Sequence, residues 1–524
     1  MNPEVLRTFL PYEPAGITAN LFTPLPIIRV LAYTDDPEQV KDDEAVGLHI
    51  GLMKKFLSAN QPAFANVEVE LLSRNVLDAS QGIVTEAGHA KEMLTGSLLM
   101  NYQQVWFFGL HLSNLSQLDW NVIPAKRGGP KSELTAPEVE SLRIWMASDV
   151  ATGGQMGGVL VAGDHSLQRS AAAVPNTLPD ILSLGRALSR RVPRAHQLRT
   201  WEGGPLRDLP DNFNTQDLNT QDPAGTCDLD AIGLGHDSIP QKLILPRLNG
   251  KCPHDLFIGK DGKVIDVYPD HPHEGEVIIT DPVINPPDGD WPSHGPQPVV
   301  VAYGTDKRKP VIYKIVAAYD GDTAGVGRIA SDSSWHHFFN DTLTDFDKDT
   351  SAGSVANRLG QYYSNLAVWL SPLPMRRTMA RAMLWWLVNH PLVVMEVGGG
   401  AMESTAGILG IGKIARTLLE RVAGPSEINA LLSAYVPASL QAGETAPHYP
   451  TGGLTLTLLP SRELVLGSII NSYYQGSPGA ALDSDTKDSA SVLINKGLAE
   501  AFDLHAKTLS AVSAQALTNS SNNL

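Results

Sequence analysis

The stretch Gly157-Gly158-Val159-Leu160-Val161-Ala162-Gly163-Asp164-His165-Ser166 decides the predicted fold. Its apolar, partly β-branched run between glycines is typical of a buried strand. This strand ends in a small residue followed by an acid and an imidazole. Ligands of doubly wound α/β folds bind beyond the carboxyl ends of the strands. Asp164 and His165 therefore stand where chemistry is expected.

Strand and helix patterns alternate along the chain around this stretch. Strands are expected at 27–33, 67–71 and 104–110, and helices at 43–59, at 177–191 and after the capping box that begins at Thr135. Glu68 and Glu70 alternate with valines, which predicts a wetter strand near a sheet edge. Because crossovers between parallel strands are right-handed, the alternation favours a parallel, doubly wound sheet.

The later part of the chain predicts further strands and then helices. Short strands are expected at 243–246, 264–268, 277–279, 298–302, 311–318 and 328–332, and helices at 355–370, 375–389, 404–423, 426–435 and 488–512, with a hairpin formed by 452–459 and 463–470. The resulting organisation is an extended arm at 1–26, an α/β domain at 27–345 with a polar excursion at 203–238, a mainly helical domain at 346–512 and a disordered tail at 513–524.

Composition narrows the class of protein. A length of 524 residues favours two or three domains. The formal net charge of −16 argues against general binding of nucleic acid, since an acidic surface repels phosphates. The two cysteines, Cys227 and Cys252, suggest neither a disulfide framework nor a metal pair, which fits a reducing cytoplasm.

No signal peptide is visible at the amino terminus. The apolar segment 382–397 is broken at Asn389-His390-Pro391, so a buried helix pair is expected there, without a membrane span.

A second polar segment, Asp270-His271-Pro272-His273-Glu274-Gly275-Glu276, follows a strand-like run. His271 and His273 would share a face if the chain were extended, whereas Pro272 makes a turn equally compatible. A polar turn that binds substrate hydroxyls is the first interpretation. A divalent metal held by His271, His273 and Glu274 is the alternative, since imidazole and carboxylate are ligands of zinc and manganese.

A third segment, Ser331-Asp332-Ser333-Ser334-Trp335-His336-His337, follows the strand at 328–332. Asp332 and one of the two histidines are expected to face a common crevice. Adjacent residues of a strand point to opposite faces, so only one histidine is expected in the site unless a helix starts there.

The glycine-rich strand ending in His165 and the later Gly325-Val-Gly-Arg-Ile-Ala-Ser-Asp-Ser-Ser-Trp-His-His segment resemble the ThuA-like (trehalose-utilization) branch of the class I glutamine-amidotransferase-like fold. The resemblance covers about residues 27–340 and leaves the C-terminal helices outside. His165 matches the family's first histidine, and His336 or His337 its second. The segment from His236 resembles a His-Pro turn of the family, with Asp237 in place of proline. Within this wider group the chain most resembles large bacterial proteins that share the Gly-Asp-His and Ser-Ser-Trp-His-His motifs. The resemblance implies a flavodoxin-like sheet and sugar-related chemistry.

Glutaminase activity is disfavoured, because that reaction needs a cysteine thiolate and no cysteine follows the 157–163 strand. The expected function is a small-molecule enzyme of hydrolase or isomerase type that acts on a polar, sugar-derived compound. His165 is the expected general base, oriented by Asp164, with His336 or His337 as the partner acid. The expected substrate-binding residues are Asp270, His271, His273, Glu274, Asp332 and Arg194.

Arg194 belongs to a basic run that could bind a carboxylate or phosphate, although such runs are commonly solvated helix faces. The alternative function is a non-catalytic scaffold on a degenerate amidotransferase-like fold. Its C-terminal helices would then bind a second copy or a partner protein.

Overall fold

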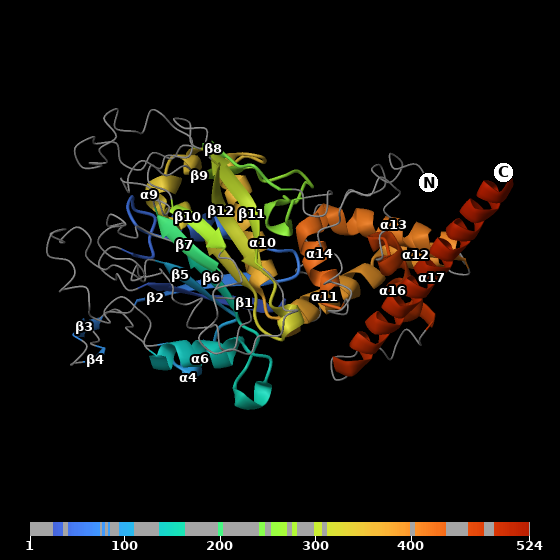
Figure 1. The fold of residues 1–524 in the computed structure, drawn as a ribbon, viewed down its shortest axis with the longest axis horizontal. Coiled ribbons are helices and arrows are strands. Elements are labelled where there is room, and N and C mark those ends of the chain that lie inside the picture. The colour runs from blue at the N-terminus through green and yellow to red at the C-terminus, as the bar shows by residue number, and fades with distance from the viewer. Residues whose placement is uncertain are drawn as a thin grey trace.

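The computed structural model describes residues 25–34, 40–73, 76–78, 82–83, 94–108, 136–162, 198–202, 240–246, 253–269, 275–279, 298–305, 312–398, 404–435, 460–475 and 487–522. Within them, a seven-stranded sheet is flanked by helices on both faces, and further helices extend to one side (Figure 1). The predicted α/β class with added C-terminal helices is confirmed at this level.

The sheet is mostly parallel. From one edge to the other its strands are β11 (Val299–Thr305), β12 (Ile312–Tyr319), β13 (Ile329–Asp332), β6 (Gly158–Ala162), β5 (Gln104–Phe108), β1 (Ile27–Thr34) and β2 (Asn66–Ser73). The five strands from β13 to β2 run parallel, and β12 is antiparallel to both of its neighbours. The strand predicted with a wetter face, β2, is an edge strand with Glu68 and Glu70 exposed.

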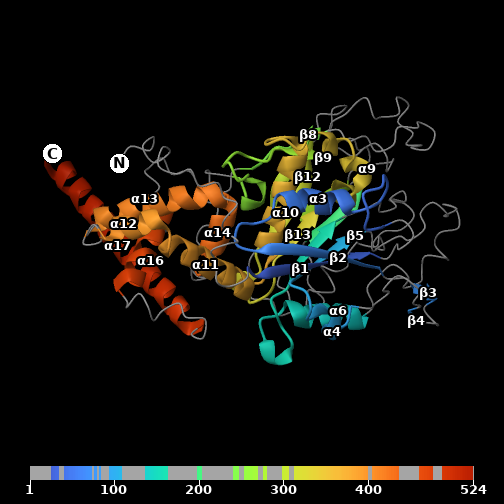
Figure 2. The same ribbon diagram turned by 180° about the vertical axis from the view of Figure 1, so that it is seen from behind.

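Two apolar cores form because successive strand residues point to opposite faces of the sheet. Ile28, Val30 and Ala32 of β1 face the layer of α3 (Gly51–Ala59) and α10 (Val355–Leu370). Leu31 and Tyr33 belong to the other core, between the sheet and the helices α4 (Gly96–Leu99) and α6 (Ala136–Met146). Figure 2 shows these three layers, with α3 and α10 on one side of the sheet and α4 and α6 on the other.

In the described part of the chain, three small antiparallel strand pairs accompany the main sheet. They are β7 (Leu198–Glu202) with β10 (Gly275–Ile279), β8 (Pro240–Lys242) with β9 (Val267–Pro269), and β3 (Val76–Asp78) with β4 (Gly82–Ile83). Short helical turns occur at η3 (Val150–Thr152), η5 (Asp255–Phe257), η6 (Asp322–Ala324), η7 (Trp335–Phe338), α9 (Asn340–Leu343) and η8 (Phe346–Lys348). The predicted strands at 243–246 and 264–268 are thus displaced by a few residues, with Ile244 retaining a single bridge to Tyr303.

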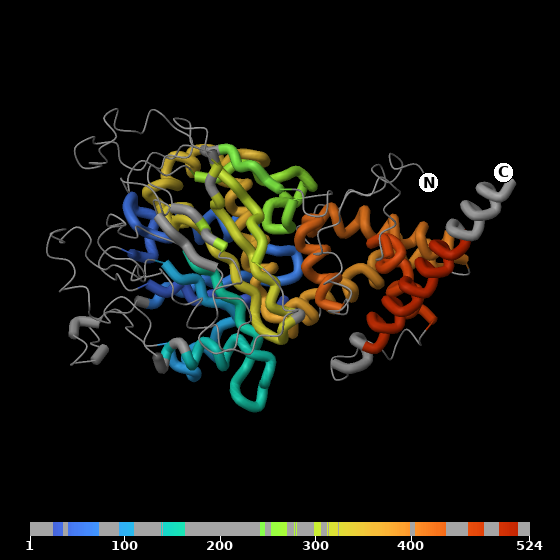
Figure 3. The backbone as a smooth tube through the Cα atoms, in the orientation of Figure 1, coloured from blue at the N-terminus to red at the C-terminus, as the bar shows by residue number. Residues whose placement is uncertain are grey.

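The C-terminal helices are α11 (Leu373–Val388), α12 (Pro391–Gly398), α13 (Thr405–Val422), α14 (Pro425–Ser433), α16 (Arg462–Gln475) and α17 (Lys487–Asn522). α10, the first helix of the expected helical region, covers the sheet, and its core residues continue into those of α11. The tube in Figure 3 follows this path from the sheet layers out to α17. The segment 382–397 forms the expected helix pair, but Met395 of α12 is 72% exposed, so the pair is not wholly buried. In the described part of the chain, no helix is both long and apolar enough to cross a membrane.

Three expectations about secondary structure need correction. Residues 463–470 lie in helix α16, because their apolar run is buried between helices and periodicity alone does not separate such a run from a strand. Helix α3 begins at Gly51, not at 43, since Gly47 has a φ of +134° that a helix does not adopt. Helix α17 continues to Asn522 through the expected tail, where alanines favour a helix.

Candidate active site

Strand β13 carries a buried carboxylate to the end of the parallel sheet. Asp332 is its last residue, and Asp332 lies in register with Ala162, the last residue of β6. The two strands that carry the polar motifs of the sequence are therefore neighbours and end together. Ligands of open α/β sheets bind at this end of the sheet, beyond the carboxyl ends of the strands.

The histidine pair lies in a helical turn after β13. Ser334 caps η7, with its side-chain oxygen accepting from the backbone N–H of His336 at 3.3 Å. Because the chain turns here, His336 and His337 reach different carboxylates. Nδ1 of His337 lies 2.6 Å from Oδ1 of Asp332, and Nδ1 of His336 lies 2.7 Å from Oδ2 of Asp341. Asp332 and one of the two histidines were expected to face a common crevice, and in the structure Asp332 contacts His337.

Tyrosines from two other elements surround the Asp332–His337 pair. The hydroxyl of Tyr268, in β9, donates to Oδ2 of Asp332, and that of Tyr362, in α10, donates to the same oxygen at 3.4 Å. The rings of Tyr268 and His337 have centroids 4.4 Å apart. Burial, together with the charge of Asp332, raises the pKa of both phenols, so they remain protonated donors.

A third tyrosine fixes the backbone of the turn. The hydroxyl of Tyr363 donates to the carbonyl of His337 at 2.6 Å. Sequence reasoning missed all three tyrosines. Tyr362 and Tyr363 lie in a helix remote in sequence from the histidines, and only the position of Tyr268, two residues before Asp270, gave a signal.

His336 has the surroundings of a packing residue. Its ring lies against Trp335 and Phe339, with centroids at 5.5 and 6.3 Å. The hydroxyl of Thr342 donates to its carbonyl oxygen. Together with the Asp341 contact, this arrangement anchors the turn, and it separates the role of His336 from that of His337.

The Asp332–His337 pair is deeply buried. Both side chains are 0% exposed, compared with 4% for His336. A carboxylate on Nδ1 fixes the tautomer and orientation of an imidazole and stabilises its protonated form, with Nε2 as the nitrogen that exchanges a proton with a reactant. Such a pair supplies acid–base chemistry where Nε2 reaches a reactant, whereas at 0% exposure the His337 ring is closed to solvent in this structure. Within the described ranges, no group of three or more His, Cys, Asp or Glu side chains is arranged to hold a metal ion.

The other predicted site residues lie outside the described residues: Asp164, His165, Arg194, Asp270, His271, His273 and Glu274. The structure thus brings together two of the predicted residues, Asp332 and His337, and gives His336 a different partner.

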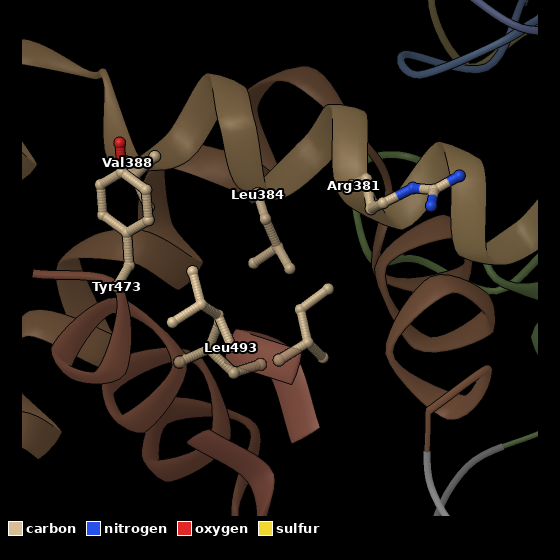
Figure 4. Close-up of a pocket in the computed structure, with 7 residues that line it drawn as sticks. Arg381, Leu384, Val388, Tyr473 and Leu493 are labelled. Atoms are coloured by element: carbon tan, nitrogen blue, oxygen red, sulfur yellow. The ribbon is translucent and has the colours of Figure 1, made fainter. Parts of the chain in front are cut away.

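A separate apolar pocket lies among the C-terminal helices (Figure 4). It is lined by Arg381, Leu384 and Val388 of α11, Ile469 and Tyr473 of α16, and Leu493 and Ile494 of α17. In Figure 4 the guanidinium of Arg381 points away from the leucines. The pocket shares no residue with the Asp332–His337 pair and offers no acid–base group other than the phenol.

Comparisons with known proteins give little further information. No family model matches the chain. No curated protein matches it either. One solved structure, an IFT52 N-terminal domain, aligns with 64% of this chain and 96% of its own, at 10% identity and a TM-score of 0.30. A similarity of that size carries no argument about fold or function.

Proposed function

We propose that the protein is a small-molecule enzyme of hydrolase or isomerase type, acting on a polar, sugar-derived compound through the Asp332–His337 pair. The observation that carries the proposal is the 2.6 Å contact between the two side chains at the carboxyl end of β13. An acid–base pair of this kind contributes about 10²–10⁴-fold in rate.

The order of the parallel strands supports a flavodoxin-like, ThuA-like fold for this enzyme. Along the sheet, β2, β1, β5, β6 and β13 are neighbours in that order. Counted by their place among the parallel strands of the sheet, this is the order 2-1-3-4-5 of flavodoxin-like sheets. The family resemblance of the sequence implies the same arrangement.

The covalent chain supports placing Asp164, His165 and Asp270 near the same end of the sheet. Ala162 lies beside Asp332. His165 follows Ala162 by three residues, so the Cα atoms of Ala162 and His165 are within about 11 Å of each other. Asp270 directly follows Pro269, the neighbour of Tyr268. We therefore assign Asp164 and His165 to an orienter and general base, and His337 to the partner acid.

The substrate-binding roles follow the same reasoning. The segment 270–274 joins the end of β9 to the start of β10, and its carboxylates and imidazoles would bind substrate hydroxyls. Arg194 would bind an anionic group of the substrate. Glutaminase chemistry stays outside the proposal, since no cysteine follows β6.

A non-catalytic scaffold is the second candidate, and the burial of the pair favours it. With Asp332 and His337 at 0% exposure, the pair can equally be an internal contact that fixes the turn. Buried charged groups are normally paired for this structural reason.

The test is turnover of a panel of sugar lactones, acetylated sugars and keto sugars by the full chain. His336→Gln is a matched control for His337→Gln, because the imidazole of His336 is also buried and also contacts a carboxylate. The enzyme proposal predicts that His337→Gln lowers kcat by about 10²-fold or more, with a much smaller loss in His336→Gln. No turnover of any panel compound, or equal losses in the two variants, would favour the scaffold.

A further inference from the structure

The loop between β1 and α3 brings another histidine to the carboxyl end of the sheet. Residues 40–50 precede α3, and the buried side chain of Asn340 holds them. The amide nitrogen of Asn340 donates to the carbonyls of Asp43 and Ala45 at 2.8 and 2.7 Å, and its Oδ1 accepts from the backbone N–H of Leu52 at 2.8 Å. Both amide hydrogens and the amide oxygen of Asn340 are thereby used.

Backbone contacts join the same loop to the turn of His336 and His337. The N–H of Asn340 donates to the carbonyl of His49 at 2.7 Å, and that of Asp341 donates to the carbonyl of Gly47 at 3.0 Å. Asp341 is also the carboxylate that contacts His336. The loop and the histidine turn are therefore one connected unit.

His49 repeats the pairing seen at His337 but keeps a solvent-accessible face. Its Nδ1 contacts Oδ1 of Asp43, which also accepts from the N–H of Ala45 at 2.9 Å. The hydrogen bond with His49 is the largest cause that lowers the pKa of Asp43. The side chain of His49 is 14% exposed, against 0% for His337.

We infer that His49, positioned by Asp43, is a further acid–base group at the carboxyl end of the sheet, in addition to His165 and His337, and the inference rests on the proposed function. Asp43 occupies Nδ1, so Nε2 is the nitrogen that takes a proton from a substrate hydroxyl. As the deprotonated hydroxyl oxygen forms a carbonyl and the neighbouring C–O bond breaks, Asp43 stabilises the imidazolium, which returns the proton to the leaving oxygen. Asn340 is a positioning residue, because it holds the loop rather than the ring.

The first test is reaction of the full chain with diethyl pyrocarbonate, followed by peptide mass spectrometry. His49 is expected to react faster than His336 and His337. A panel sugar at about ten times its Kd is expected to slow the reaction of His49 about tenfold. If no panel compound changes the rate at His49, the inference is wrong, whatever the activity of the protein.

The second test compares His49→Gln with Asp42→Asn. Asp42 is one residue from Asp43 and forms an exposed ion pair with Lys54, at 2.6 Å, so its loss should leave kcat unchanged. His49→Gln is expected to lower kcat about 10²-fold. Asp43→Asn should lower kcat while KM stays constant, which a purely structural role would not produce.

The two proposals fail in different ways. A large loss in His337→Gln with normal kcat in His49→Gln would overturn the role of His49 and leave the enzyme proposal intact. Absence of turnover in the wild type would remove the enzyme proposal. Protection of His49 by a sugar would then still show binding at this loop, and lack of protection would overturn that as well.

Discussion

Two glycines of α13 allow the packing of the C-terminal helices to be tested with a matched pair of variants. A Cβ added at Gly412 would lie 1.7 Å from the carbonyl oxygen of Glu463 in α16, whereas one added at Gly410 would meet nothing within 4 Å. The two positions lie on the same helix, two residues apart. Any difference between Gly412→Ala and Gly410→Ala therefore reports the contact with α16.

The expected magnitudes have opposite signs. An ordinary C···O contact is about 3.3 Å, so the helices would have to separate by about 1.6 Å at Gly412. Overpacking of this kind costs about 1–3 kcal/mol, and replacement of glycine by alanine within a helix returns up to about 1 kcal/mol. Gly410→Ala should gain only the stabilisation of up to about 1 kcal/mol that alanine gives within a helix. The separation would also disturb the ion pair of Arg416 with Glu463.

The assay is urea unfolding of the full chain, followed by circular dichroism at equilibrium. Gly410→Ala should unfold at the wild-type urea concentration or slightly above it, and Gly412→Ala at a lower one. Hydrogen exchange of the α16 amides should rise in Gly412→Ala alone. Equal midpoints for the two variants, or a more stable Gly412→Ala, would refute the close contact of α13 and α16.

Three further predictions concern buried polar groups. Burial, with the positive charge of Arg328, lowers the pKa of His254 to about 4, so the unfolded chain binds more protons than the folded chain between pH 6.5 and 4. The free energy of unfolding should therefore fall by about 2 kcal/mol as the pH drops through that range. The urea midpoints at pH 7 and 4.5 should differ less in His254→Asn than in the wild type, and an equal difference in the two proteins would contradict this. Asp332→Asn should lower the free energy of unfolding by at least about 2 kcal/mol, because Asp332 accepts hydrogen bonds from His337 and Tyr268. An unchanged melting temperature would be evidence against that network. Arg376→Met should lower the free energy of unfolding, measured in urea, by about 3 kcal/mol, because it leaves the buried carboxylate of Asp322 with one cation fewer. A urea midpoint equal to that of the wild type would show that this ion pair adds nothing to stability.

The strands of the sheet were predictable where local sequence determines them. The run from Gly158 to Ala162 is apolar and bounded by glycines, and the run from Ile329 ends at the polar Asp332, so both strands and their ends followed from pattern alone. The apolar run of α16 carries no such boundaries. Its helix follows from burial between α13 and α17, which no local pattern encodes.

The candidate site was predictable only in part, for a similar reason. Asp332 and the two histidines are close in sequence, so their proximity was expected, but the choice of His337 depends on the η7 turn. The phenol of Tyr362 and the loop of His49 reach this edge through long-range contacts. The hydrogen bond from Asn340 to Asp43, for example, spans 297 residues.

The proposed active site requires that Asp164 and His165, after β6, lie beside the Asp332–His337 pair. A crystal structure that includes residues 163–166 measures this directly, as the separation between Nε2 of His337 and the nearest polar side-chain atom of Asp164 or His165. We expect a separation of at most about 6 Å, which one bridging water spans. A separation beyond about 10 Å, or side chains on opposite faces of the sheet, would contradict it.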